Sequence, residues 1–134
     1  MQYEWSSALE TGYPEIDEEH KQLVSTLNDL LIACGCGGHR SELKKTLDFL
    51  VSYTVKHFAD EESFQLRYKY PDYERHKQLH ENFKAVATDL ARRLLEEGAT
   101  ISLLAEVQSS LGDWLVNHIK GEDLNIGLHA REQS

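Results

Sequence analysis

Histidine is the residue type in this sequence best suited to chemistry, with seven copies among 134 residues. His76 and His80 stand four residues apart, and His57 stands four residues before Glu61. On an α-helix this spacing places both side chains on one face, where a single metal ion can bind both. Each pair alone is a weak indication, because a chain this rich in histidine contains such spacings by chance.

A third candidate pair begins at His118, which is followed by two carboxylates, Glu122 and Asp123. Glu122 is four residues on and therefore shares a helical face with His118. Asp123 is five residues on, which in a regular α-helix leaves the two side chains about 140° apart. Helical periodicity alone favours Glu122. Asp123 can join His118 only if the helix widens into a π-type turn, which Gly121 would tolerate.

The elements that must position these residues are four amphipathic helices. Apolar residues spaced by three and four predict helices that begin after Asp17, at about residue 41, after Asp72 and at about residue 102. The first helix ends at the glycines of 35–38, the second near residue 68, the third at Gly98 and the fourth near residue 120. Asp17 and Asp72 are suited to the N-cap positions of their helices.

Short connections make neighbouring helices antiparallel, so the predicted fold is all-α, an up-down-up-down antiparallel four-helix bundle. We expect residues 1–134 to form a single domain. It would comprise an N-terminal loop over residues 1–16, the bundle over about residues 17–122, and a short C-terminal tail.

Chain reversal gathers the candidate residues at one end of this bundle. Five histidines and Glu61 continue the spacing of the apolar residues on their helices, so their side chains should point into the bundle. They fall near the start of the first and third helices and near the end of the second and fourth, within roughly 10–15 Å of one end. Because buried imidazoles need partners for their ring nitrogens, a shared metal site is favoured over ordinary core packing. The five are His20, His57, His76, His80 and His118.

In their order along the chain, these residues resemble the ligand signature of the hemerythrins in their single-domain bacterial form. The signature reads His20, then His57-x-x-x-Glu61, then His76-x-x-x-His80, then His118-x-x-x-x-Asp123. The resemblance extends over nearly the whole chain and includes Trp5, Ile16-Asp17 and Trp114-Leu115.

This resemblance implies a non-haem di-iron centre with an oxo or hydroxo bridge. It implies that one iron is bound by His76, His80 and His118, and the other by His20 and His57. Glu61 and Asp123 would bridge the two irons, so the resemblance selects Asp123 over Glu122. Counting ligands then leaves one open position, on the iron with two histidines, where dioxygen could bind.

The function this predicts is reversible dioxygen binding, by an oxygen carrier, store or supplier rather than an enzyme. Five neutral imidazoles with only two carboxylates should keep the diferrous state accessible, whereas ferritin-like di-iron proteins use a carboxylate-rich set. A dry pocket would protect the bound oxygen from water. Helical spacing and the resemblance together indicate which residues would line this pocket. They are Leu23, Phe58, Trp114, Leu115 and Ile119.

Two other classes of function use the same residues and stay open at this point. One is a di-iron oxidase or peroxide-consuming enzyme, and the other is a sensor of oxygen or iron. Zinc is an alternative metal, because imidazole-rich sites suit it as well as iron.

The overall composition argues against several partners. The net charge of −9 disfavours nucleic acid and anionic membranes. The longest apolar run, Leu30 to Cys34, is too short to cross a membrane, and the start of the chain has no signal-peptide pattern. Cys34 and Cys36 are too close for an unstrained disulfide, so free thiols, remote from the site, and a cytoplasmic location are expected. His39 and His129 are expected at the surface.

Overall fold

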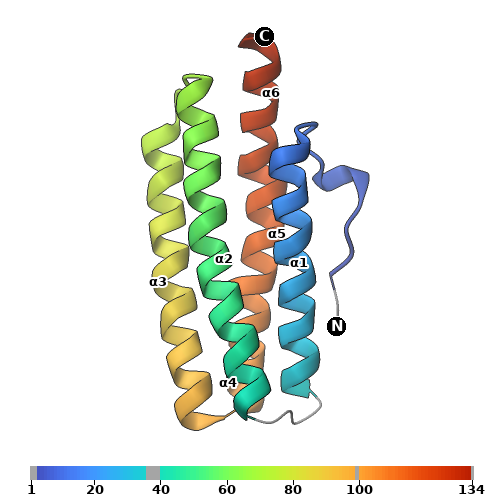
Figure 1. Ribbon diagram of the computed structural model, residues 1–134, viewed down its shortest axis with the longest axis vertical. Helices are drawn as coiled ribbons and strands as arrows, with labels where there is room; N and C mark the ends of the chain where they lie inside the picture. The colour runs from blue at the N-terminus through green and yellow to red at the C-terminus, as the bar shows by residue number, and fades with distance from the viewer. Residues whose placement is uncertain (1–2, 36–39, 99, 134) are drawn as a thin grey trace.

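The computed structural model describes residues 3–35, 40–98 and 100–133, and in these ranges the only regular structure is helical. Four helical columns run antiparallel to their neighbours (Figure 1), which confirms the predicted four-helix bundle. The first three columns are α1 (Pro14–Gly35), α2 (Arg40–Arg67) and α3 (Tyr73–Glu97). None of the helices in the described ranges combines the length and the hydropathy needed to span a bilayer.

The fourth column is a continuous helical path that contains two π-helical segments. In chain order it consists of α4 (Ile101–Glu106), a first π segment (Val107–Asp113), α5 (Trp114–His118), a second π segment (Ile119–Asp123) and α6 (Leu124–Gln133). The column begins at Thr100, whose hydroxyl accepts a hydrogen bond from the Leu103 amide at 3.1 Å. π-helical turns are rare and are often found at functional sites, so the two segments mark this column for closer inspection.

Of the two aspartates predicted as N-caps, Asp72 lies at that position and Asp17 does not. α1 begins at Pro14, a residue favoured in the first turn of a helix, so the N-terminal loop is shorter than predicted. Asp17 lies inside α1, where its carboxylate accepts hydrogen bonds from Thr11 (N and Oγ1, both 2.8 Å) and from the amide of Gly12 (3.2 Å). Asp17 therefore fixes the N-terminal loop to the first turns of α1. Asp72 does occupy the N-cap of α3, but its side chain makes no capping hydrogen bond.

The predicted short tail is instead the helix α6, which carries the fourth column beyond residue 122. Ile126 and Ala130 of α6 are buried and pack into a small apolar cluster. The remaining buried members of this cluster are Ile16, Phe64 and Tyr70. The tail is therefore part of the bundle, and it closes one end of it.

The small cluster and the main core lie on opposite sides of a polar layer. On α1, Ile16 of the small cluster and Leu23 of the main core flank His20 in the sequence. On α2, Phe58 of the main core and Phe64 of the small cluster flank Glu61 in the same way. Apolar side chains thus cover the polar layer from above and below, which excludes water from it.

Close packing of α6 against the N-terminal loop depends on Gly127. A Cβ atom at this position would lie 2.6 Å from the carbonyl oxygen of Thr11, a backbone atom that cannot swing aside. We expect Gly127→Ala to lower the free energy of unfolding by about 1–3 kcal/mol, as overpacking does elsewhere. Urea unfolding of the metal-free protein measures this.

Gly121→Ala is the matched control, because a Cβ at Gly121 meets nothing within 4 Å. Helix propensity alone should make that variant more stable, by up to about 1 kcal/mol. Equal effects of the two substitutions would show that the contact between Gly127 and Thr11 is unimportant.

Candidate metal centre

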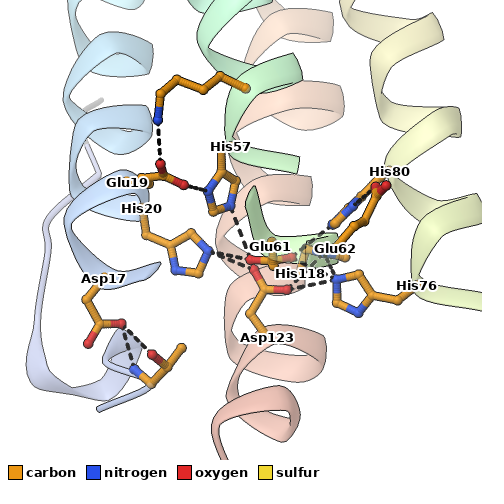
Figure 2. Close-up of polar contacts among 12 residues, drawn as sticks. Asp17, Glu19, His20, His57, Glu61, Glu62, His76, His80, His118 and Asp123 are labelled. Carbon is orange, nitrogen blue, oxygen red and sulfur yellow. Dashed lines mark hydrogen bonds and ion pairs between the residues drawn. The ribbon is translucent and has the colours of Figure 1, made fainter. Parts of the chain in front are cut away.

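Seven polar side chains from the four columns meet in the buried layer. Each is at most 6 % exposed. Figure 2 shows two carboxylates in the middle, with histidines of α1 and α2 on one side and histidines of α3 on the other. All seven residues predicted from the sequence as metal ligands are brought together here. They are His20, His57, Glu61, His76, His80, His118 and Asp123.

The Glu61 carboxylate turns one oxygen to each side of the layer. Its Oε2 lies 3.1 Å from Nε2 of His20 and 3.2 Å from Nε2 of His57. Its Oε1 lies 3.0 Å from the Nε2 atoms of both His76 and His80. A carboxylate that faces two separate pairs of imidazoles is placed to bridge two cations.

Asp123 repeats this arrangement from the fourth column. Its Oδ2 lies 3.0 Å from Nε2 of His20, and its Oδ1 lies 3.0 Å from Nε2 of His76 and 3.1 Å from Nε2 of His118. The second π segment makes this possible, because bonding between residues five apart brings Asp123 onto the face of His118. The widened turn that the sequence required for Asp123 is therefore present.

Glu122, the carboxylate that periodicity favoured, points away from the layer. The guanidinium of Arg75 holds it with two hydrogen bonds, one of them 3.2 Å long between Nη1 and Oε1. That hydrogen bonding and the positive charge of Arg75 keep the pKa of Glu122 below its usual value. The wide turn thus sends one carboxylate inward and its neighbour outward to a cation at the surface.

Two overlapping groups of these side chains could each hold one metal ion. Within each group, one ligand atom per residue lies within 4.8 Å of all the others. The first group has three histidines, His76, His80 and His118, and the second has two, His20 and His57. Glu61 and Asp123 belong to both groups. The result is an unequal pair of sites that share two carboxylates.

The hydrogen bonding inside the layer is incomplete without cations. Nε2 of His80 and Oδ1 of Asp123 are buried within about 3 Å of the partners given above, yet among the described residues neither atom forms a hydrogen bond of regular geometry. Nε2 of His76 and Nε2 of His118 face each other at 3.1 Å, where only one proton can lie between them. Unpaired buried polar atoms are costly, and imidazole with carboxylate is a donor set that iron and zinc accept. The residues therefore fit two bound metal ions.

Protons can take the place of metal ions in the metal-free chain. Burial opposes charging of His20 and His76, but hydrogen bonds with Asp123 and Glu61 raise their pKa values to about 10 and about 9. Burial also opposes ionisation of the two carboxylates. Nevertheless, the pKa of Glu61 is lowered chiefly by His57 and that of Asp123 chiefly by His118. In the metal-free chain the layer is thus held together by charged pairs.

Two further glutamates orient ligand histidines from outside, one on each side of the layer. The Nδ1–H of His57 donates to Glu19 and the Nδ1–H of His80 donates to Glu62, both at 2.8 Å. Such outer partners fix the ring and make its metal-binding nitrogen more basic. Burial would raise the pKa of Glu19, but hydrogen bonds with His57 and Lys56 bring it to about 2, so it is a carboxylate at neutral pH.

Sequence reasoning missed Glu19 and Glu62, although each directly neighbours a predicted ligand in the chain. We expect Glu19→Gln to weaken metal binding by about 10- to 100-fold, the usual cost of losing an outer partner. Glu18→Gln removes the same charge from the preceding, exposed residue and should leave the affinity unchanged. Competition with a chromogenic chelator compares the two variants, and equal affinities would contradict a role for Glu19.

The residues predicted to line an oxygen pocket divide into two sets. Leu23, Phe58 and Leu115 line an apolar cavity of about 10 Å³, close to the space that one water-sized molecule needs. Ile119 is fully buried in the main core, and Trp114 stacks on the ring of His118 with centroids 4.5 Å apart. The other residues lining the cavity are Leu27, Leu50, Thr54, Phe83 and Leu111.

The remaining histidines and the cysteines lie away from the layer or outside the described residues. His129, expected at the surface, is half-buried on α6 and its Nε2–H donates to the carbonyl of Tyr68 at 2.8 Å. Cys34 lies near the C-terminal end of α1, at the opposite end of that helix from His20. His39 and Cys36 lie outside the described residues.

Comparisons with known proteins agree with this geometry. The family model described as the hemerythrin HHE cation binding domain matches residues 11–127. A bacteriohemerythrin of Stenotrophomonas maltophilia is 36% identical over 120 residues, covering 89% of this chain and 75% of that protein. A myohemerythrin of Theromyzon tessulatum is 32% identical over 121 residues, covering 90% and 88%. A crystal structure of a hemerythrin mutant superposes with a TM-score of 0.83 at 30% identity, covering 96% of each chain.

Proposed function

Because this chain belongs to the hemerythrin family of oxygen-binding, non-haem di-iron proteins, we propose that it binds dioxygen reversibly for transport, storage or delivery. The observation that carries the proposal is the unequal division of five imidazoles around two shared carboxylates. The metal ion on the side with two histidines would have one protein ligand fewer than the metal ion on the side with three. A coordination position is thereby available to a small molecule.

We assign the ligands accordingly. His76, His80 and His118 would hold one iron, and His20 and His57 would hold the other. Glu61 and Asp123 would be shared by the two irons, since each turns a separate oxygen toward each group. When bound, the di-iron centre supplies the electrons and the vacant coordination position that dioxygen binding needs.

The surrounding protein contributes shape and exclusion of water. Leu23 follows His20 by one helical turn, and Leu115 precedes His118 by one turn, so both lie directly beside the ligand layer. Phe58 stacks on His80 with ring centroids 3.8 Å apart and also lines the apolar cavity. A dry, apolar wall on this side of the layer limits the access of water and protons, which favours release of dioxygen over its irreversible reduction.

The test is the addition of dioxygen to protein loaded anaerobically with ferrous iron. We expect two irons per chain, an absorption spectrum that appears with one dioxygen per two irons, and its loss on degassing. Rapid, irreversible oxidation with turnover of dioxygen or peroxide would support the di-iron oxidase instead. Protein purified with zinc in both positions would contradict the proposal, because zinc cannot give electrons to dioxygen.

A further inference from the structure

The first π segment determines which way the rest of the fourth column faces. It directly precedes α5, which carries Trp114, Leu115 and His118. A π turn accommodates one residue more than an α turn, so rewinding it as α-helix would rotate the following residues by about 100°. His118 would then no longer point at the layer. Because π turns are intrinsically rare, contacts from elsewhere must favour this one.

Tyr3 of the N-terminal loop makes such contacts. Its hydroxyl lies 3.0 Å from the carbonyl oxygen of Gln108 and 2.7 Å from Oδ1 of Asp113, so it reaches both ends of the π segment. Burial and the hydrogen bond to Asp113 raise the pKa of Tyr3 above its ordinary value. The hydroxyl therefore keeps its proton at neutral pH and acts as a donor.

The ring of Tyr3 occupies a notch made by Gly112. A Cβ atom at Gly112 would overlap the Tyr3 hydroxyl oxygen and would lie 2.6 Å from two carbons of the Tyr3 ring. Glycine inside a helix costs about 1 kcal/mol relative to alanine. Its presence in the middle of the π segment is explained by this close approach.

Tyr3 is itself fixed to α1, on the other side of the contact. Its backbone amide donates to Oδ1 of Asn28, and Nδ2 of Asn28 donates to the carbonyl of Tyr3, both at 2.8 Å. The side-chain amide of Asn28 thus pairs with both backbone polar groups of Tyr3, as a neighbouring strand would in a β-sheet. Tyr3 thus connects the middle of α1 to the π segment of the fourth column.

We propose that Tyr3 is a positioning residue, which holds the first π segment in register and so keeps His118, Trp114 and Leu115 directed toward the metal centre. Its effect on dioxygen rests on the proposed function, whereas its effect on the register applies to the metal-free chain as well. The anchored phenol, the two acceptors on the π segment and the glycine notch together carry the proposal.

Hydrogen exchange of the metal-free protein tests the register with Tyr3→Phe, which removes only the hydroxyl. We expect amides of 108–118 to exchange about tenfold faster, the change that loss of one hydrogen bond produces, while amides of α2 and α3 keep their rates. Tyr13→Phe makes the same change elsewhere in the N-terminal loop and should leave every rate unchanged. Unchanged exchange over 108–118 in Tyr3→Phe would overturn the proposal.

The visible absorption spectrum of the iron-loaded protein tests positioning, because a purely stabilising role of Tyr3 would leave it unaltered. We expect the iron bands to shift in Tyr3→Phe and in Gly112→Ala, which expels the ring by steric conflict, and to be unchanged in Tyr13→Phe. Faster hydrogen exchange without any shift of the iron bands in Tyr3→Phe and Gly112→Ala would refute the positioning role. The wild-type protein could fail to bind dioxygen while the variants still show both the faster exchange and the shifted iron bands. In that case the proposed function fails and the role of Tyr3 is supported.

Discussion

Replacement of Asp123 by asparagine is expected to abolish tight binding of iron at both positions. The carboxylate contacts His20 on one side of the layer and His76 and His118 on the other, so one substitution removes an anionic ligand from each metal ion. The loss of affinity should exceed the roughly 100-fold that removal of an outer partner costs. Iron per chain after anaerobic loading and desalting measures it, with circular dichroism to verify the helical fold.

Glu122→Gln is the control, since it neutralises the adjacent carboxylate without changing a residue of the layer. Glu122 pairs with Arg75 at the surface, and an exposed ion pair of this kind contributes about 0–1 kcal/mol. That variant should load two irons with unchanged affinity. Loss of iron in Glu122→Gln, or full loading in Asp123→Asn, would mean that the fourth column does not take the path through its second π segment.

This comparison also shows where reasoning from the sequence ends. The inward direction of His20, His57, His76, His80 and His118 follows from α-helical periodicity, and the antiparallel topology follows from short connections. Periodicity selects the wrong carboxylate after His118, because the helix there is not an α-helix. Only the family resemblance selected Asp123 from the sequence.

Contacts between elements distant in the sequence were invisible for a different reason. Glu19 and Glu62 have the composition of ordinary surface residues, and only the packing of α1 on α2 and of α2 on α3 reveals their histidine partners. Gly112 and Gly127 interrupt the apolar pattern of the fourth column, yet each is required by a close approach of the N-terminal loop. A glycine that permits contact cannot be distinguished, in one sequence, from a glycine that ends a helix.

The second large effect is expected on the stability of the metal-free protein as the pH rises. His20 and His76 have pKa values of about 10 and about 9 in the folded chain, against 6.5 for the ordinary side chain. A base with a raised pKa stabilises the fold fully below its ordinary pKa, and this contribution is lost as the pH rises through the folded value. Each such proton changes the free energy of unfolding by at most about 1.4 kcal/mol per pH unit.

The carboxylates of Glu61 and Asp123 determine how the stability of the metal-free protein changes at acidic pH. The pKa values of Glu61 and Asp123 are lowered in the folded chain, so their contribution is present above about pH 4.5 and is lost as the pH falls further. The metal-free protein should therefore be most stable between about pH 4.5 and 6.5 and should weaken steadily toward pH 9.

Iron should reverse this pH dependence on the alkaline side. A metal ion binds only the neutral imidazole, so it competes with the protons that hold the layer together in the metal-free protein. The stabilisation that iron gives is then small near pH 5, where protons occupy the histidines, and large near pH 9, where they are leaving. A site filled at a thousandfold excess over its dissociation constant adds about 4 kcal/mol. Thermal unfolding of metal-free and iron-loaded protein at pH 5, 7 and 9 should show a difference that widens with pH. A difference that is constant across this range would mean that the buried histidines of the metal-free chain are neutral, and that charged pairs do not hold the layer together.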